Sequence, residues 1–247
     1  MTSEGRGEMT FLEHFEELRS RIFKGLMGLL AALAVVSVYV KPLMDFLLAP
    51  YYRYLPEEQQ SLAYTQVTEI FFVYMKFALV GAVFLGAPWF FYQLWAFIAP
   101  GLKRRERLWA FPFVLFTSLF FMGGMVFSYM VVIPVTLRFF FSLNQGYTNV
   151  VTLSSFWAFE MKFLLALGLV FETPILIFLL TRLGLVSTGW LLRNTKWAVL
   201  VAFAVSAVIT PSGDPVTQTI VALPIVILYL LGIAVSWIFR KRSAEGE

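Results

Sequence analysis

The sequence predicts an all-α integral membrane protein with six membrane-spanning helices. Of the 247 residues, 60% are hydrophobic and 18% are aromatic, and the mean hydropathy is +0.79. A soluble domain of this length is much more polar. Because a helix needs about 20 apolar residues to cross a hydrocarbon core of about 30 Å, the chain has room for about six spans and little else.

The first span is predicted over residues 22–40, after a polar N-terminal segment of residues 1–21. Near the end of that segment, apolar residues recur at the spacing of one helix face: Phe11, Phe15, Leu18 and Ile22. We expect an amphipathic helix that lies on the membrane surface and continues into the first span.

The second span is predicted over residues 70–98, and Pro88 inside it is expected to tilt or kink the helix. The longest polar connection of the chain, residues 41–65, precedes this span. Three prolines are expected to divide that connection into short pieces: Pro42, Pro50 and Pro56.

A short basic loop follows the second span. Pro100 and Gly101 end the apolar run, and one acid, Glu106, then stands in a group of bases: Lys103, Arg104, Arg105 and Arg107. The loop is therefore a positively charged membrane-flanking segment that contains a single carboxylate.

The third span is predicted over residues 108–133. Gly123 and Gly124 would allow another helix to approach closely, and Pro134 is expected to bend the outer end. Three more spans are predicted: the fourth over residues 156–180, a short fifth over 197–209 and a sixth, with a proline inside, over 216–239.

Basic residues predict the orientation. With the N-terminus inside, 14 of the 19 lysines and arginines fall in inner segments, so both termini are expected in the cytoplasm. The chain is then one integral membrane domain, residues 1–247, made of an N-terminal tail (1–21), a six-helix core (22–239) and a short cytoplasmic tail (240–247). No internal repeat is visible, which disfavours a repeat-built transporter.

Several function classes are excluded by residue types. The chain has no cysteine and one histidine, His14, so we expect no redox chemistry and no multi-histidine metal site. There is no P-loop pattern, no nucleophile–base pair and no paired carboxylates in one span, so we expect no enzyme and no cofactor. The bases lie in membrane-flanking clusters, which does not indicate a nucleic-acid partner.

Glu172 is the sharpest functional signal, because it lies midway along the fourth predicted span. Nine residues of helix place it roughly 13 Å below the inner face, where a charge costs about 2.5–3.5 kcal/mol on insertion scales. It is either a polar site that contacts a substrate, a partner or a proton, or a neutral acid bonded to a neighbouring helix. Glu160 and Lys162 are expected near the outer interface, where charges cost little.

Two further carboxylates are predicted on the inner surface. Glu106 is either a solvated loop acid or a binding residue, and Glu17 either pairs with Arg21 four residues later or binds a ligand. Together, Glu17 and Glu106 would suit a pair of guanidinium groups through bidentate bonds.

The turn between the fifth and sixth spans carries polar residues. Asp214 is expected to be a turn residue, and Glu69, at the start of the second span, is expected to favour the helix dipole. Thr210 and Gln218 flank the turn. Gln218 on an otherwise apolar helix would hydrogen-bond either a partner helix or a group within the chain.

Four segments, in this order, resemble the TatC family, the multispanning subunit of the twin-arginine protein translocase. They are FLEHFEELRSR (residues 11–21), APWFFYQLWAFIAPGLKRRER (87–107), FETP (171–174) and ITPSGDPVTQT (209–219). The resemblance covers nearly the whole chain. It implies six helices in a concave, glove-like arrangement with a short fifth and sixth helix.

The resemblance also implies a function. The chain would be the core and receptor subunit that binds twin-arginine signal peptides of folded proteins in the bacterial cytoplasmic (inner) membrane. Transport would use the proton gradient. The implied partners are single-span membrane proteins of the TatA and TatB type and further copies of the chain itself.

Site residues follow from the matching positions. The resemblance implies that Glu17 and Glu106 meet the signal's arginines, with Phe97 close to the loop, although Glu13 and Glu16 stay candidates for the N-terminal contact. Glu172 would line the concave face. The remaining implied positions are a sensitive outer-loop proline and two partner-docking residues: Pro50, Thr210 and Gln218.

Two other functions stay open at this point. A proton-coupled small-solute transporter would use Glu172 and would not need Glu106. A scaffold that gathers other membrane proteins would contact no substrate.

Overall fold

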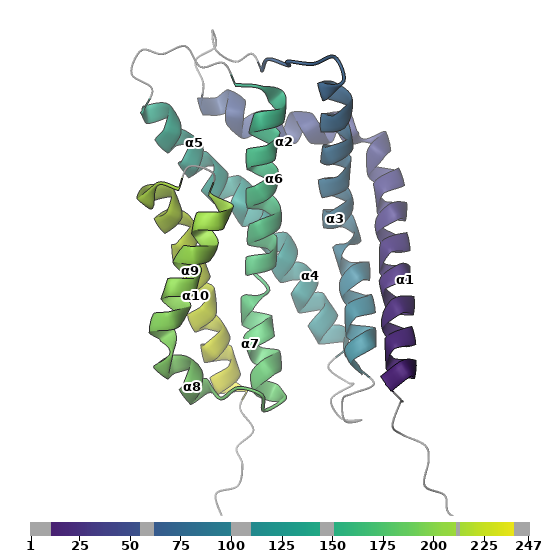
Figure 1. The fold of residues 1–247 in the computed structure, drawn as a ribbon, viewed down its shortest axis with the longest axis vertical. Coiled ribbons are helices and arrows are strands. Elements are labelled where there is room, and N and C mark those ends of the chain that lie inside the picture. Colours follow the sequence, from purple (N-terminus) through teal and green to yellow (C-terminus); the bar gives the residue numbers. More distant parts are fainter. Residues whose placement is uncertain (1–10, 55–61, 100–109, 144–150, 211–212, 240–247) are drawn as a thin grey trace, which may run out of the picture.

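The computed structural model describes residues 11–54, 62–99, 110–143, 151–210 and 213–239, and Figure 1 shows them as a bundle of helices. In these ranges the regular structure is helical, apart from one isolated bridge between Ala63 and Thr152. The elements are α1 (Phe11–Val38), α2 (Val40–Tyr54), α3 (Glu69–Ile98), α4 (Ala110–Phe127), η4 (Ser128–Val132), α5 (Ile133–Ser142), α6 (Leu153–Val170), α7 (Thr173–Arg182), α8 (Thr188–Arg193), α9 (Thr195–Ile209) and α10 (Pro215–Ile238).

The described residues contain five helical segments long and apolar enough to cross a membrane, and α9 is a shorter apolar helix. The first described residue of α1 and the end of α10 lie at the same end of the bundle, at the bottom of Figure 1. An even number of crossings returns the chain to the side where it started, so α9 serves as the sixth crossing. The predicted six-span arrangement with a short fifth helix is confirmed.

Helices α9 and α10 end well below the tops of α3 and α6 (Figure 1). Large apolar side chains on the outside of the bundle, such as Val208 (82% exposed) and Met130 (68% exposed), would be costly in water. They suit a lipid-facing surface.

Helix α1 runs without interruption from Phe11 to Val38. The amphipathic segment expected on the membrane surface is therefore the first part of the same straight helix that forms the first span (Figure 1). Helix α1 packs along α3, where the Trp89 indole N–H donates to the Lys24 carbonyl at 2.9 Å.

The expectation of short pieces in residues 41–65 was wrong for the first half of that connection. Residues 40–54 form one helix, α2, which crosses the end of the bundle opposite the termini (Figure 1). Pro42 lies in its first turn, where no backbone N–H is needed, and Pro50 removes only one hydrogen bond. The helix is stabilised because Leu47, Leu48 and Tyr51 on one face are buried.

Gly124 brings α4 close to α6. A Cβ at this position would lie 2.5 Å from the Leu167 carbonyl oxygen, whereas a Cβ at Gly123 would meet nothing within 4 Å. The predicted close contact is confirmed at Gly124 and is absent at Gly123. Further along, the five-residue π-helix η4 leads into Pro134, which lies in the first turn of α5. Proline has no backbone N–H, so the regular hydrogen-bond pattern is interrupted at this point, next to the π-helix.

Candidate functional site

The first turns of α1 lie beside the last turns of α3, and polar side chains meet there. The Glu17 Oε1 atom is 3.4 Å from the Arg21 Nη2 atom, and Arg21 Nη1 donates to Gln93 Oε1 of α3 at 3.4 Å. The expected ion pair between Glu17 and Arg21 is confirmed. It uses one carboxylate oxygen, and the other, Oε2, is buried without a hydrogen-bond partner among the described residues.

A ring contact completes this site. The His14 imidazole stacks on the Phe97 phenyl ring, with centroids 4.5 Å apart and planes 17° from parallel. The His14 side chain is exposed, and its ring contact joins α1 to α3. We call the group Glu17, Arg21, Gln93, His14 and Phe97 the α1–α3 rim.

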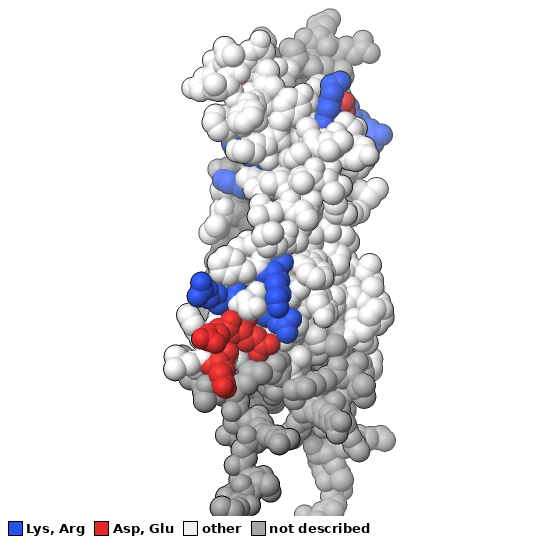
Figure 2. Space-filling view, turned by 90° about the vertical axis from the view of Figure 1, so that its right-hand side faces the viewer, with Lys and Arg blue, Asp and Glu red and all other residues white. Residues whose placement is uncertain are grey.

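The charges of α1 are segregated along the helix. Figure 2 shows a group of acidic side chains toward the lower end of the molecule, with basic side chains directly above it. In the sequence these are three acids in the first two turns and three bases in the next two: Glu13, Glu16, Glu17, Arg19, Arg21 and Lys24. Glu13 and Glu16 are exposed and Glu17 is half-buried. The predicted partner residue Glu106 lies outside the described residues.

Glu172 lies at the break between α6 and α7. Phe171 and Glu172 form a turn, α7 begins at Thr173, and Pro174 lies in its first turn, where its missing N–H is not needed. The side chain is 7% exposed, and its Oε1 atom has no hydrogen-bond partner in the described part of the chain. Of the two alternatives for Glu172, the described residues show no bond from Oε1 to a neighbouring helix.

Glu160 does not lie where the sequence predicted it. The sequence interpretation placed it with Lys162 near the outer interface, but Glu160 is 0% exposed and neither of its carboxyl oxygens has a partner among the described residues. The physical reason is helical spacing: Glu160 follows Trp157 by three residues and precedes Phe163 by three, so it shares the face of α6 that packs into the core. Lys162 points the other way and is exposed.

Glu69 also does more than the predicted interaction with the helix dipole. Its carboxylate accepts hydrogen bonds from the Thr65 backbone N–H at 2.7 Å, the Thr65 hydroxyl at 2.9 Å and the Ser154 N–H at 3.0 Å. It therefore joins the start of α3 to the start of α6. No local sequence signal indicated Ser154, because the two residues are 85 positions apart.

The polar residues around the α9–α10 turn form hydrogen bonds to other groups of the chain. Thr210 is buried and its hydroxyl donates to the Ser206 carbonyl at 2.8 Å. Asp214 caps α10 by accepting from the Thr217 N–H at 2.8 Å. The Gln218 amide donates to the Gly213 carbonyl at 2.9 Å. Of the two alternatives for Gln218, the described structure shows the internal contact.

Pro50 is buried inside α2, and not in an open loop. The next residue, Tyr51, is 1% exposed and packs against Phe156 at a centroid distance of 4.8 Å. Pro50 therefore helps to position the helix that covers the core.

Across the described ranges, no group of three or more metal-ligating side chains lies together.

Comparison with known proteins identifies the family. Residues 13–224 match the family of the Sec-independent protein translocase protein TatC. A TatC from Koribacter versatilis is 37% identical over 98% of this chain and 90% of its own length, and one from Desulforapulum autotrophicum is 34% identical over 96% and 87%.

A crystal structure of the twin-arginine translocase receptor TatC has the same fold. Its TM-score is 0.79 with 28% identity, covering 91% of this chain and 98% of that one. The chain therefore belongs to the TatC family and is a multi-pass core subunit of the twin-arginine protein translocase.

Proposed function

We propose that the α1–α3 rim is the place where this chain receives the arginine pair of a twin-arginine signal peptide. The observation that supports the proposal most directly is the state of Glu17. One of its oxygens is held by Arg21 at 3.4 Å, which is long for a charge-assisted bond, and the other is buried and unpartnered among the described residues.

An incoming guanidinium can improve on this arrangement. An ion pair at i and i+4 on a helix is worth only a few tenths of a kcal/mol, whereas a planar guanidinium can donate to both carboxylate oxygens at once. A signal arginine would then displace Arg21 from Glu17, and Arg21 would keep its contact with Gln93. Lysine cannot form the same two-point contact, so an arginine pair is favoured over a lysine pair.

Glu106 supplies the second carboxylate in this proposal. It follows Phe97 by nine residues in the sequence, and Phe97 is part of the rim through its contact with His14. Glu13 and Glu16 stay candidates for the first contact, because both are exposed on the same turns of α1 as Glu17.

The apolar part of the signal would then lie along the helices and extend toward Glu172. This acid has a buried oxygen with no partner in the described residues, so a polar group of the signal or of a partner helix would satisfy it. We propose a hydrogen-bonding role for Glu172, and proton transfer is not required.

Partner subunits are proposed to dock at the α9–α10 turn. Gln218 uses one amide N–H for the Gly213 carbonyl, and its side chain is only half-buried, which leaves its own carbonyl oxygen for a partner helix. The neighbouring Val208 is 82% exposed and adds apolar contact area. Single-span proteins of the TatA and TatB type and further copies of the chain are the proposed partners.

The proposed setting is the bacterial cytoplasmic membrane, with the α1–α3 rim and both termini on the cytoplasmic side. Export would be driven by the proton gradient without an enzymatic step. A small-solute transporter is not favoured, since the relatives are protein translocase subunits.

The experiment is site-specific photocrosslinking from position 17 and position 106 to a twin-arginine precursor in membrane vesicles. We expect crosslinks that disappear when the precursor's two arginines become two lysines. Equal crosslinking of the arginine and lysine precursors would contradict the proposal.

A further inference from the structure

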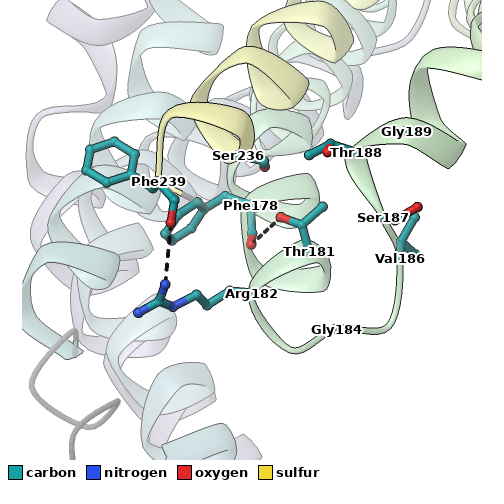
Figure 3. Close-up of a pocket in the computed structure, with 10 residues that line it drawn as sticks. All are labelled: Phe178, Thr181, Arg182, Gly184, Val186, Ser187, Thr188, Gly189, Ser236 and Phe239. Carbon is teal, nitrogen blue, oxygen red and sulfur yellow. Dashed lines mark hydrogen bonds between the residues drawn. The ribbon is translucent and has the colours of Figure 1, made fainter. Parts of the chain in front are cut away.

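Two adjoining cavities lie at the end of α7. The first, about 440 Å³, is formed by the α7–α8 connection and the end of α10, and Figure 3 shows its lining. We call it the polar cup. The second, about 330 Å³, lies between α4, α7 and α10, and Trp95 of α3 also lines it; its walls are almost entirely apolar, and we call it the apolar groove. Phe178, Arg182 and Phe239 line both, so the two cavities are neighbours.

Arg182 stands at the junction. Its guanidinium makes one hydrogen bond, from Nη1 to the Phe239 carbonyl at 3.4 Å (Figure 3), and no carboxylate among the described residues pairs with it. A basic residue in the last turn of a helix also interacts favourably with the helix dipole, and this is the ordinary explanation for an arginine at position 182. That reason does not account for a guanidinium with one long bond at the mouth of an apolar groove.

Ser236 is the second observation. Its side chain is 5% exposed and lines the polar cup, but its hydroxyl has no hydrogen-bond partner among the described residues. The nearby Thr181 hydroxyl, by contrast, donates to carbonyls of its own helix. A buried hydroxyl without a partner costs free energy, so an acceptor bound in the cup would remove that cost.

The apolar groove indicates what kind of molecule carries the acceptor. Its walls include aromatic residues of α4 and aliphatic residues of α7: Phe113, Phe116, Phe120, Ile175 and Leu179. A soluble phosphate would use the cup alone. A phospholipid would fill both cavities, with the phosphate in the cup and one acyl chain in the groove.

The position in the bundle agrees with a headgroup. The cup lies at the end of the molecule where the charged first turns of α1 also lie, at the bottom of Figure 1. Basic pockets between membrane helices at this level are typical sites for anionic lipid headgroups.

We propose that the polar cup and the apolar groove together bind one anionic phospholipid, whose phosphate accepts hydrogen bonds from Arg182 and Ser236. None of the residues that line the two cavities belongs to the α1–α3 rim, so this inference does not depend on the proposed signal-binding role.

The test is native mass spectrometry of the full chain, purified in detergent and titrated with dioleoylphosphatidylglycerol or dioleoylphosphatidylcholine. We expect the wild type to retain the anionic lipid preferentially. Arg182→Gln should lower the fraction with bound phosphatidylglycerol roughly fivefold, because a charge-assisted bond is lost. Ser236→Ala should lower it about twofold. The phosphatidylcholine fraction should be lower in the wild type and change less, because the choline cation offsets the charge of the phosphate that Arg182 and Ser236 contact.

Arg193→Gln is the matched control, because Arg193 is an exposed base on α8 that lines neither cavity. Equal losses for Arg182→Gln and Arg193→Gln would overturn the proposal, since the attraction would then be non-specific. Glycerophosphoglycerol, the same headgroup without acyl chains, should not displace the lipid at equal concentration. Displacement would show that the cup binds a soluble phosphate ester and that the groove has no part in it.

Discussion

The Glu69 carboxylate, at the start of α3, accepts a hydrogen bond from the Ser154 backbone N–H, at the start of α6, with a distance of 3.0 Å. The same carboxylate accepts two bonds from Thr65. One side chain thus holds together three segments at the end of the bundle that α2 also covers.

Glu69→Gln should lower the midpoint of chemical unfolding, because the amide replaces a charged acceptor of three bonds by a neutral one. Chemical unfolding in detergent, followed by tryptophan fluorescence, measures this. Thr68→Ala is the control: Thr68 caps the same helix without a side-chain hydrogen bond, so its loss should have little effect. Similar changes in both variants would show that the Glu69 bonds contribute nothing.

Glu160→Leu should stabilise the protein by about 1–3 kcal/mol, because a buried carboxyl without described partners is replaced by an apolar group of similar size. The same unfolding measurement applies. Lys162→Met, on the exposed face of the same helix turn, should change stability by less than about 0.5 kcal/mol. A destabilised Glu160→Leu variant would mean that the carboxyl is hydrogen-bonded in the membrane.

Gly124→Ala should destabilise the protein by about 1–3 kcal/mol, since its Cβ would lie 2.5 Å from the Leu167 carbonyl and would push α4 away from α6. Gly123→Ala has open space around its Cβ and should be neutral or stabilising by up to about 1 kcal/mol, because alanine is the better helix former. The quantity to measure is the difference in the free energy of unfolding between the two variants. If both were neutral, the close approach of the two helices would be wrong.

Glu17→Gln should weaken the binding of a twin-arginine signal peptide about tenfold, which corresponds to the loss of one charge-assisted hydrogen bond. Arg21→Gln should instead leave binding unchanged or strengthen it up to about twofold, because Arg21 competes for Glu17 with a pair worth a few tenths of a kcal/mol. Fluorescence anisotropy with a labelled signal peptide measures both. Weaker binding in Arg21→Gln would show that the intrahelical pair forms part of the receptor site and does not compete with it.

Glu172→Gln should retain export, and Glu172→Leu should lose most of it, if this residue acts as a hydrogen-bonding group. Transport of a reporter precursor into inverted vesicles measures both variants. A Gln variant as inactive as the Leu variant would show instead that Glu172 must release or accept a proton.

The sequence by itself determined the six spans and the ends of four of them; the first helix begins earlier than predicted, at Phe11, and the third helical segment continues beyond residue 133 to Ser142. Long apolar segments predicted the helices α3, α6–α7 and α10 to within a few residues, and the short fifth segment gave α9. Pro134 correctly predicted an irregular point, next to the π-helix η4, whereas Pro42 and Pro50 lie within the single helix α2. The resemblance of four segments to TatC also pointed correctly to the family.

Only the tertiary structure decided which faces are covered by protein. In a membrane, lipid and protein interior are equally apolar, so hydropathy cannot tell whether α6 turns Glu160 or Lys162 toward the core. The hydrogen bond of Glu69 with Ser154 and the cavity that both Arg182 and Ser236 line bring together residues far apart in the sequence. Spacing along one helix says which residues share a face, but the packing of neighbouring helices decides what that face meets.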